Sequence, residues 1–115
     1  MTTLKNVKTT SFLAEGTELE GDLFLTGAIR IDGQFKGSIQ CDSVVFVGEN
    51  GRVDGDITAQ GVVSSGVIHG NLNTTHEVIL SLPGRFKGKV ITRELVLDNG
   101  VHFEGQCELL EDAAK

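Results

Sequence analysis

The residues of this chain that could do chemistry are few and widely spaced. The only imidazoles are His69, His76 and His102, and histidines on neighbouring turns of a repeat could together bind a metal ion. His69 occupies an outward polar position of a repeated motif, and His102 precedes an inward Phe. The sequence therefore favours solvated surface histidines, and we expect no metal site and no cofactor.

The cysteines and glycines are better explained by structure than by catalysis. Cys41 and Cys107 lie in different repeats of a chain that shows no signal peptide, so we expect reduced thiols rather than a disulfide. Cys107 fills a column otherwise made of Leu, Ile and Val, as a small apolar residue would. Gly-x-x-x-Gly spacings recur inside strand corners and do not indicate a phosphate loop, so no nucleotide is expected.

Length and charge narrow the classes further. The chain has 115 residues, enough for one domain with a core of its own. A net charge of −6 argues against nucleic acid as a partner, because phosphate neutralisation requires a basic surface. Residues 1–8 carry no apolar run long enough for secretion or membrane spanning, so we expect a cytoplasmic protein.

A short motif recurs six times, with an apolar residue, then Gly two positions later, then another apolar residue two positions after that. The glycines follow one another at spacings of 15 to 18 residues, a period that suits one turn of a β-solenoid. The six copies are Leu19–Leu23, Phe35–Ile39, Val53–Ile57, Ile68–Leu72, Phe86–Val90 and Phe103–Cys107.

Strand geometry assigns a direction to each position of the motif. Positions one, three and five point inward, because side chains alternate between the two faces of a strand. The invariant Gly at position three is expected at an inward bend where no Cβ fits. Positions two and four form outward ladders without adjacent like charges, as parallel in-register stacking favours. The ladder at position two is Glu20, Lys36, Asp54, His69, Lys87 and Glu104.

A second apolar stretch precedes most motifs and leads into a corner. Examples are Val45–Val47 and Leu95–Leu97, followed by Asn50-Gly51 and Asn99-Gly100. Such dipeptides supply the positive φ of sharp turns. The sequence thus predicts an all-β solenoid with two or three short faces per rung and a roughly triangular cross-section.

These repeats resemble those of the bactofilins, a family of bacterial polymer-forming cytoskeletal proteins. The resemblance rests on Asp32–Ile39, Gly51–Ile57 and Gly84–Val90, together with the opening Ser11–Thr17 and the closing Gly100–Cys107. It implies a right-handed parallel β-helix of about six rungs that forms non-polar filaments without nucleotide, like ends meeting. It also implies a scaffold, often on the inner membrane face, that localises cell-wall enzymes or other morphogenetic proteins.

The terminal rungs are the candidate polymerisation interface. An uncapped solenoid exposes strand edges and a cross-section of its core, and no polar capping helix is evident in the sequence. We expect Phe103 to be central to one contact. The candidate residues are Phe12, Leu13, Leu19 and Leu23 in the first rung and Leu95, Leu97, Phe103, Leu109 and Leu110 in the last.

A second candidate surface is the N-terminal segment, with residues 1–10 as a tail, 11–109 as the solenoid and 110–115 as a short C-terminal tail. Two lysines beside apolar residues would bind an anionic membrane weakly, and a filament would repeat that contact. A disordered tail explains the segment equally well. The candidate contacts are Leu4, Lys5, Val7 and Lys8.

Two other classes of function remain alternatives to the scaffold. One is a trimeric β-helical acyltransferase or metal-dependent hydratase, which would require regular six-residue repeats or histidines aligned across rungs. The other is a monomeric binding solenoid, which would require a conspicuous surface patch. The sequence shows neither the regular six-residue period nor such a patch, and the scaffold is the leading interpretation.

Overall fold

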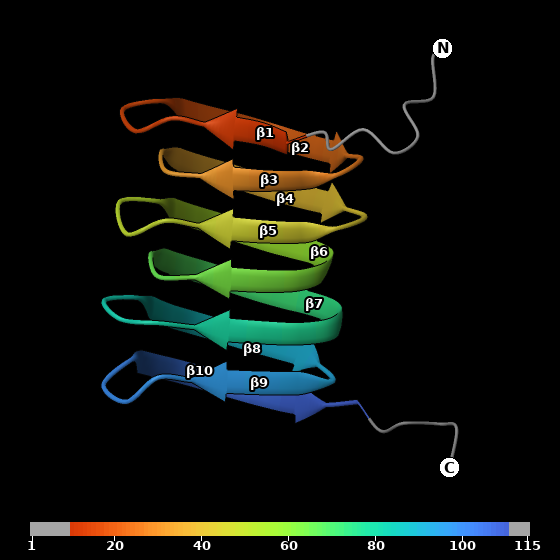
Figure 1. Cartoon of the computed structure of the whole chain (residues 1–115), viewed down its shortest axis with the longest axis vertical. Coiled ribbons are helices and arrows are strands. Elements are labelled where there is room, and N and C mark those ends of the chain that lie inside the picture. The colour runs from red at the N-terminus through yellow and green to blue at the C-terminus, as the bar shows by residue number, and fades with distance from the viewer. Residues whose placement is uncertain (1–9, 111–115) are drawn as a thin grey trace.

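Alternating apolar residues and glycine-containing corners fold this chain into short strands that coil into a stack of turns (Figure 1). The computed structural model describes residues 10–110, and within that range every regular element is a strand. The strands are β1 (Thr10–Leu13), β2 (Glu18–Leu25), β3 (Ala28–Ile31), β4 (Gln34–Cys41), β5 (Val44–Val47), β6 (Arg52–Ser64), β7 (Val67–Leu80), β8 (Arg85–Thr92), β9 (Glu94–Leu97) and β10 (His102–Leu109).

Each strand before the last turn pairs in parallel with the strand one turn further along the chain. The short strands β1, β3, β5 and β9 and the second halves of β6 and β7 form one face, and the motif strands form the wall behind it (Figure 1). In that view the front strands run leftward, the rear strands run rightward and the chain descends, so the coil is right-handed. The predicted parallel β-solenoid of about six turns is confirmed. Its roughly triangular cross-section stays a prediction.

The core consists of the inward columns that the motif predicts. Position one stacks Phe35 on Val53, Val53 on Ile68 and Ile68 on Phe86, and each of these four side chains is at most 1% exposed. Position five forms a matching column that begins at Leu23. A column of identical or similar apolar residues fills each layer in the same way, which explains why the motif tolerates Phe, Val, Ile and Leu at one position.

The outward ladder at position two also has the predicted register. Glu20 lies beside Lys36, Lys36 beside Asp54, and Lys87 beside Glu104. The ladder at position four carries hydrogen bonds from one turn to the next. The Ser38 hydroxyl donates to the Asp22 carboxylate over 2.8 Å, and the Asn71 amide donates to Asp56 over 3.1 Å. These contacts hold neighbouring turns in register on the polar wall.

The prediction that no Cβ fits at the motif glycine is confirmed inside the stack, and the obstacle is the backbone of the neighbouring turn. Gly37, Gly55, Gly70 and Gly88 all have φ between 134° and 143° and are half-buried rather than turned into the core. A Cβ on any of them would overlap the carbonyl oxygen of the glycine one turn earlier. The constraint is therefore a backbone conformation that only glycine adopts readily, combined with close stacking between turns, and not an inward bend.

The expectation of positive φ at the Asn-Gly and Asp-Gly corners is wrong for most of them. Gly100 has φ 90°, whereas Gly33 after Asp32 and Gly51 after Asn50 lie outside the left-handed region. Gly66 and Gly84, which follow Ser65 and Pro83, lie outside it too. These four glycines are required for space, because a Cβ at Gly84 would sit 2.7 Å from the Ser81 carbonyl oxygen, and similar clashes occur at the other three. Glycine is required at these four corners because the chain passes close to neighbouring backbone atoms, and not because of the dihedral angle.

Candidate polymerisation surfaces at the two ends

The terminal strands of the solenoid have a partner on one side only. Within residues 10–110, β1 pairs only with β3 and β2 only with β4 at the N-terminal end. At the other end, β9 pairs only with β7 and β10 only with β8. The outer edge of each terminal strand therefore presents N–H and C=O groups that another strand could satisfy.

The N-terminal end exposes apolar side chains that are covered everywhere else in their columns. Leu19 is 40% exposed, whereas Phe35, one turn further in, is 1% exposed. Leu13 and Leu23 are half-buried, and each packs against the buried core of the next turn. A shallow apolar hollow of about 180 Å³ opens between these residues. Its lining includes Ser11, Leu13, Leu19, Leu23 and Leu25.

The C-terminal end has the same character. Leu97 is 43% exposed, whereas its neighbour one turn further in, Leu80, is 2% exposed. The ring of Phe103 stacks on that of Phe86, with centroids 5.2 Å apart and planes inclined by 24°, and its outer side faces no further rung. Leu95 is half-buried. An apolar, uncovered cross-section thus ends the stack at this side too.

Two of the candidate residues lie beside the end faces rather than in their inward columns. Phe12 is 61% exposed and lies in register with Arg30, which is also exposed, so it belongs to an outward column of the front face, although it also helps to line the N-terminal hollow. Leu110 follows β10, and its backbone N–H donates to the Thr92 carbonyl oxygen over 2.8 Å. By contrast, Leu109 lies in register with the buried Thr92 and is 58% exposed, so it belongs to an inward column.

Two end-face residues were absent from the candidate set. Leu25 lies in register with the buried Cys41, and the exposed Cys107 lies in register with the buried Val90. The inward alternation of the last motif already pointed to Cys107. The alternation past position five of the first motif pointed to Leu25. Partial desolvation raises the pKa of the Cys107 thiol, as expected beside an apolar surface.

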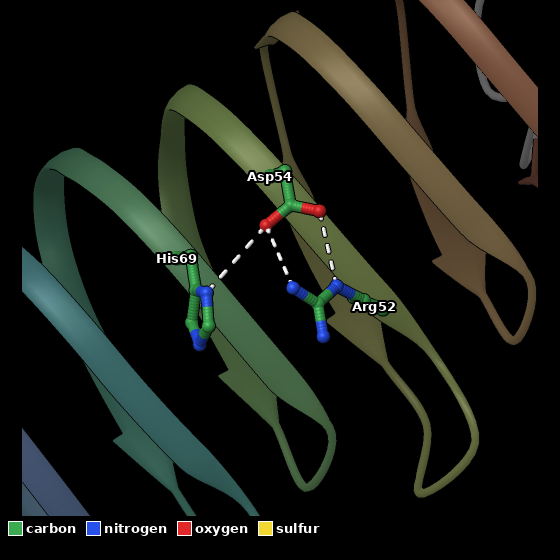
Figure 2. A network of polar contacts seen from close by, with 3 residues as sticks. All are labelled: Arg52, Asp54 and His69. Atoms are coloured by element: carbon green, nitrogen blue, oxygen red, sulfur yellow. Dashed lines mark hydrogen bonds and ion pairs between the residues drawn. The ribbon is translucent and has the colours of Figure 1, made fainter.

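The histidines lie on the outer surface and in different columns. His69 Nδ1 is 3.7 Å from Asp54 Oδ1, and Arg52 Nε donates to Asp54 Oδ2 over 3.0 Å, all three at least 31% exposed (Figure 2). His102 contacts Glu104 at 3.4 Å, and His76 lies beside Thr75. Among residues 10–110, no three His, Cys, Asp or Glu side chains are placed to hold a metal ion. These are solvated polar contacts of the wall.

The candidate membrane contacts Leu4, Lys5, Val7 and Lys8 lie outside the described residues. In the part of the chain that the structure covers, no helix has both the length and the apolar character needed to cross a bilayer.

The fold and its ends define a class of protein: a parallel β-solenoid whose first and last turns are both open to a further turn. The sequence model of the bactofilins, described as polymer-forming cytoskeletal, matches residues 11–108. The chain belongs to the bactofilin family.

Named relatives agree with this assignment. The chain is 28% identical over 99 residues to bactofilin BacP of Myxococcus xanthus, and the match covers 86% of this chain and 39% of that protein. The chain thus spans about two fifths of the length of that curated relative.

Two solved structures of Thermus thermophilus bactofilin are also similar. One is a cryo-EM reconstruction of double helical filaments, 33% identical with a TM-score of 0.80, covering 84% of this chain and 96% of that one. The other is a crystal structure of a phenylalanine-to-arginine mutant, 29% identical with a TM-score of 0.70, covering 78% of this chain and 100% of that one. Both structures are similar to this chain in amino-acid sequence as well as in fold.

Proposed function

We propose that this chain is a non-enzymatic subunit of a bacterial cytoskeletal filament that polymerises through its terminal rungs and needs no nucleotide. The observation that carries the proposal is the difference in exposure between inner and terminal members of the same inward column. Side chains that are at most 2% exposed inside the stack have counterparts 40–58% exposed in the end rungs. Covering that apolar surface and pairing the free strand edges both stabilise an end-to-end contact.

We further propose that like ends meet, so that the filament is non-polar. Head-to-tail stacking would place Glu104 of one subunit directly beside Glu20 of the next, in a ladder whose interior neighbours never carry like charges. Adjacent like charges destabilise a parallel ladder. A two-fold junction at the N-terminal end also brings acidic residues together, because the outward residues of β2 include Glu18, Glu20 and Asp22. The charges do not select the polarity, and the proposal of like ends rests on family membership. The double helical filaments of the Thermus relative support lateral pairing of these filaments as well.

The end contact is tested with Phe103→Arg. The substitution places an unpaired charge in the C-terminal junction and should cost that junction several kcal/mol. Gln106→Arg is the matched control, since it adds the same charge to the same strand at an exposed outward position. Without nucleotide, we expect pelleting filaments from the parent and from Gln106→Arg, and soluble Phe103→Arg protein. Long filaments of Phe103→Arg would contradict the end contact.

The size of the soluble species decides the polarity. If like ends meet, Phe103→Arg removes only the C-terminal junction and leaves the N-terminal one, so analytical ultracentrifugation should find dimers. A head-to-tail polymer has a single type of junction, and the same variant would then be a monomer. A monomer would refute the non-polar filament and leave the end contact standing.

The cellular role proposed for the filament is a cytoplasmic scaffold, held at the inner membrane face, that places cell-wall enzymes or other morphogenetic proteins for cell shape or polar organisation. Family membership supports the scaffold role. The membrane contact would come from Leu4, Lys5, Val7 and Lys8 in the N-terminal segment. Liposome flotation checks it: filaments should float with anionic vesicles, and filaments lacking residues 1–10 should not. Equal flotation of both would exclude the segment as the anchor.

A further inference from the structure

An apolar column runs along the outside of the solenoid, on the front strands β1, β3, β5, β6, β7 and β9. Its members are stacked in register from the first turn to the last, and five of the six are apolar. They form what is called here the apolar stripe: Phe12, Arg30, Phe46, Val63, Ile79 and Val96.

The stripe is accessible along its length. Phe12 is 61% exposed, Phe46 is 41% exposed and Val96 is 40% exposed, while Val63 and Ile79 are half-buried. The rear wall differs, because its outward ladders at motif positions two and four consist of charged and amide or hydroxyl side chains. The rear wall is therefore mainly polar, with Phe24 exposed on β2, and the front carries a column of apolar side chains that only Arg30 interrupts.

The surroundings of the stripe favour a flat apolar partner. The adjacent outward column places Val44 beside Gly61, and both help to line a shallow, mainly apolar hollow with Val63. The one basic member, Arg30, is held by Asp32 at 2.9 Å along the strand surface. Small residues at Gly61 and Ala28 let another surface approach the stripe closely.

Charge near the stripe argues against a lipid partner. The same adjacent column continues through Glu77 and Glu94, and a membrane with anionic headgroups would be repelled by these carboxylates. The guanidinium of Arg30 is already paired, so it offers little to a phosphate. A protein surface with its own apolar residues fits better.

The stripe begins and ends in the rungs that form the proposed junctions. End-to-end polymerisation therefore repeats it along the filament, with a period of two subunits when like ends meet. A single stripe is narrow and would hold two monomers together weakly. Two filaments of the same subunit present matching repeats, so many weak contacts act together.

We propose that the apolar stripe is the surface by which two filaments of this chain pair side by side. This inference rests on the proposed function, and it assigns the lateral contact to the front strands rather than to the polar rear wall. Pairing covers the exposed aromatic and aliphatic side chains of both filaments.

The test compares filaments of two variants that gain the same charge on opposite sides of the solenoid. Phe46→Glu replaces an exposed ring in the middle of the stripe with a carboxylate. Thr58→Glu, at an exposed outward position of β6, is the matched control. Mass per length by scanning transmission electron microscopy should fall by half for Phe46→Glu, with the axial repeat unchanged, and should match the parent for Thr58→Glu.

A milder variant guards against a folding defect in Phe46→Glu. The double substitution Val63→Thr and Ile79→Thr keeps β-branched shapes on the strand and should also give single filaments, or paired filaments that separate at a higher salt concentration than the parent's when salt is diluted, because salt screens the repulsion between the acidic subunits. Paired filaments in all variants, or single filaments in the parent, would overturn the inference while leaving the proposed function intact. If the parent forms no filament at all, the proposed function itself fails.

Discussion

The motif glycines show how a neighbouring turn can require one residue type at a given position. Gly55 combines φ of 140° with a hydrogen that points at the carbonyl oxygen of Gly37, one turn earlier. Gly21 has nearly the same dihedral angle, φ 138°, but belongs to the first rung and has nothing within 4 Å of its ideal Cβ position. Comparing Gly21 with Gly55 therefore separates the cost of the dihedral angle from the cost of overlap with the preceding turn.

Alanine at these two positions should therefore have unequal effects. Gly21→Ala carries only the strain of an unfavourable dihedral angle, about 1–3 kcal/mol. Gly55→Ala adds overlap with a neighbouring backbone that cannot move away without breaking the ladder, so we expect a much larger loss or no folded protein. Urea unfolding measures both in a background that carries Phe103→Arg and Leu19→Arg, so that the N-terminal junction beside Gly21 is broken as well. Equal losses would show that the contact between turns is unimportant.

The repeating turn behaves as an interchangeable element, since each turn contacts only its two neighbours. Gly51 and Gly66 occupy the same corner of successive turns, with their carbonyl oxygens accepting from Val67 and Arg85 respectively. Removing residues 51–65 would join Asn50 to Gly66 and place β4 directly beside the first half of β7. The inward columns stay apolar across the new contact, with Phe35 on Ile68.

A chain without residues 51–65 should consequently fold and polymerise, with the axial repeat of the filament shortened by about 4.8 Å per subunit, the spacing of paired strands. Cryo-EM layer lines measure the change. Deleting residues 52–58 is the control, because it removes about half a turn, puts inward residues outside and should abolish folding. An unchanged axial repeat in the full-turn deletion would contradict the one-turn, one-layer architecture.

The molecule as a whole offers three kinds of surface, each suited to a different task. The polar wall, with ladders such as Glu20, Lys36 and Asp54 and hydrogen bonds between turns, keeps the layers in register and faces solvent. The two end faces expose core columns and free strand edges, which suits growth along the axis. The apolar stripe on the front strands suits pairing across it.

Several features of this protein could be predicted from the sequence, because they depend only on residues close together in the chain. The alternation of side chains within a strand identified the inward columns through Phe35 and Ile39. The spacing of the motif identified which residues of successive turns become neighbours, such as Glu20 and Lys36. Both rest on the fixed two-residue period of a strand and on the regular length of the turn.

Other features depended on what lies one turn away. In Val45-Phe46-Val47 and Leu95-Val96-Leu97 all three residues are apolar, so alternation could not tell the inward pair from the outward residue, and the stripe was not predicted. The reason for the glycine column was also missed, since it depends on where the carbonyl oxygen of the preceding turn lies. The local pattern determines the layers and which of them come last. The dihedral angles at the glycines and the surface of the front face are decided only when the layers stack, because each is set by atoms of a neighbouring turn.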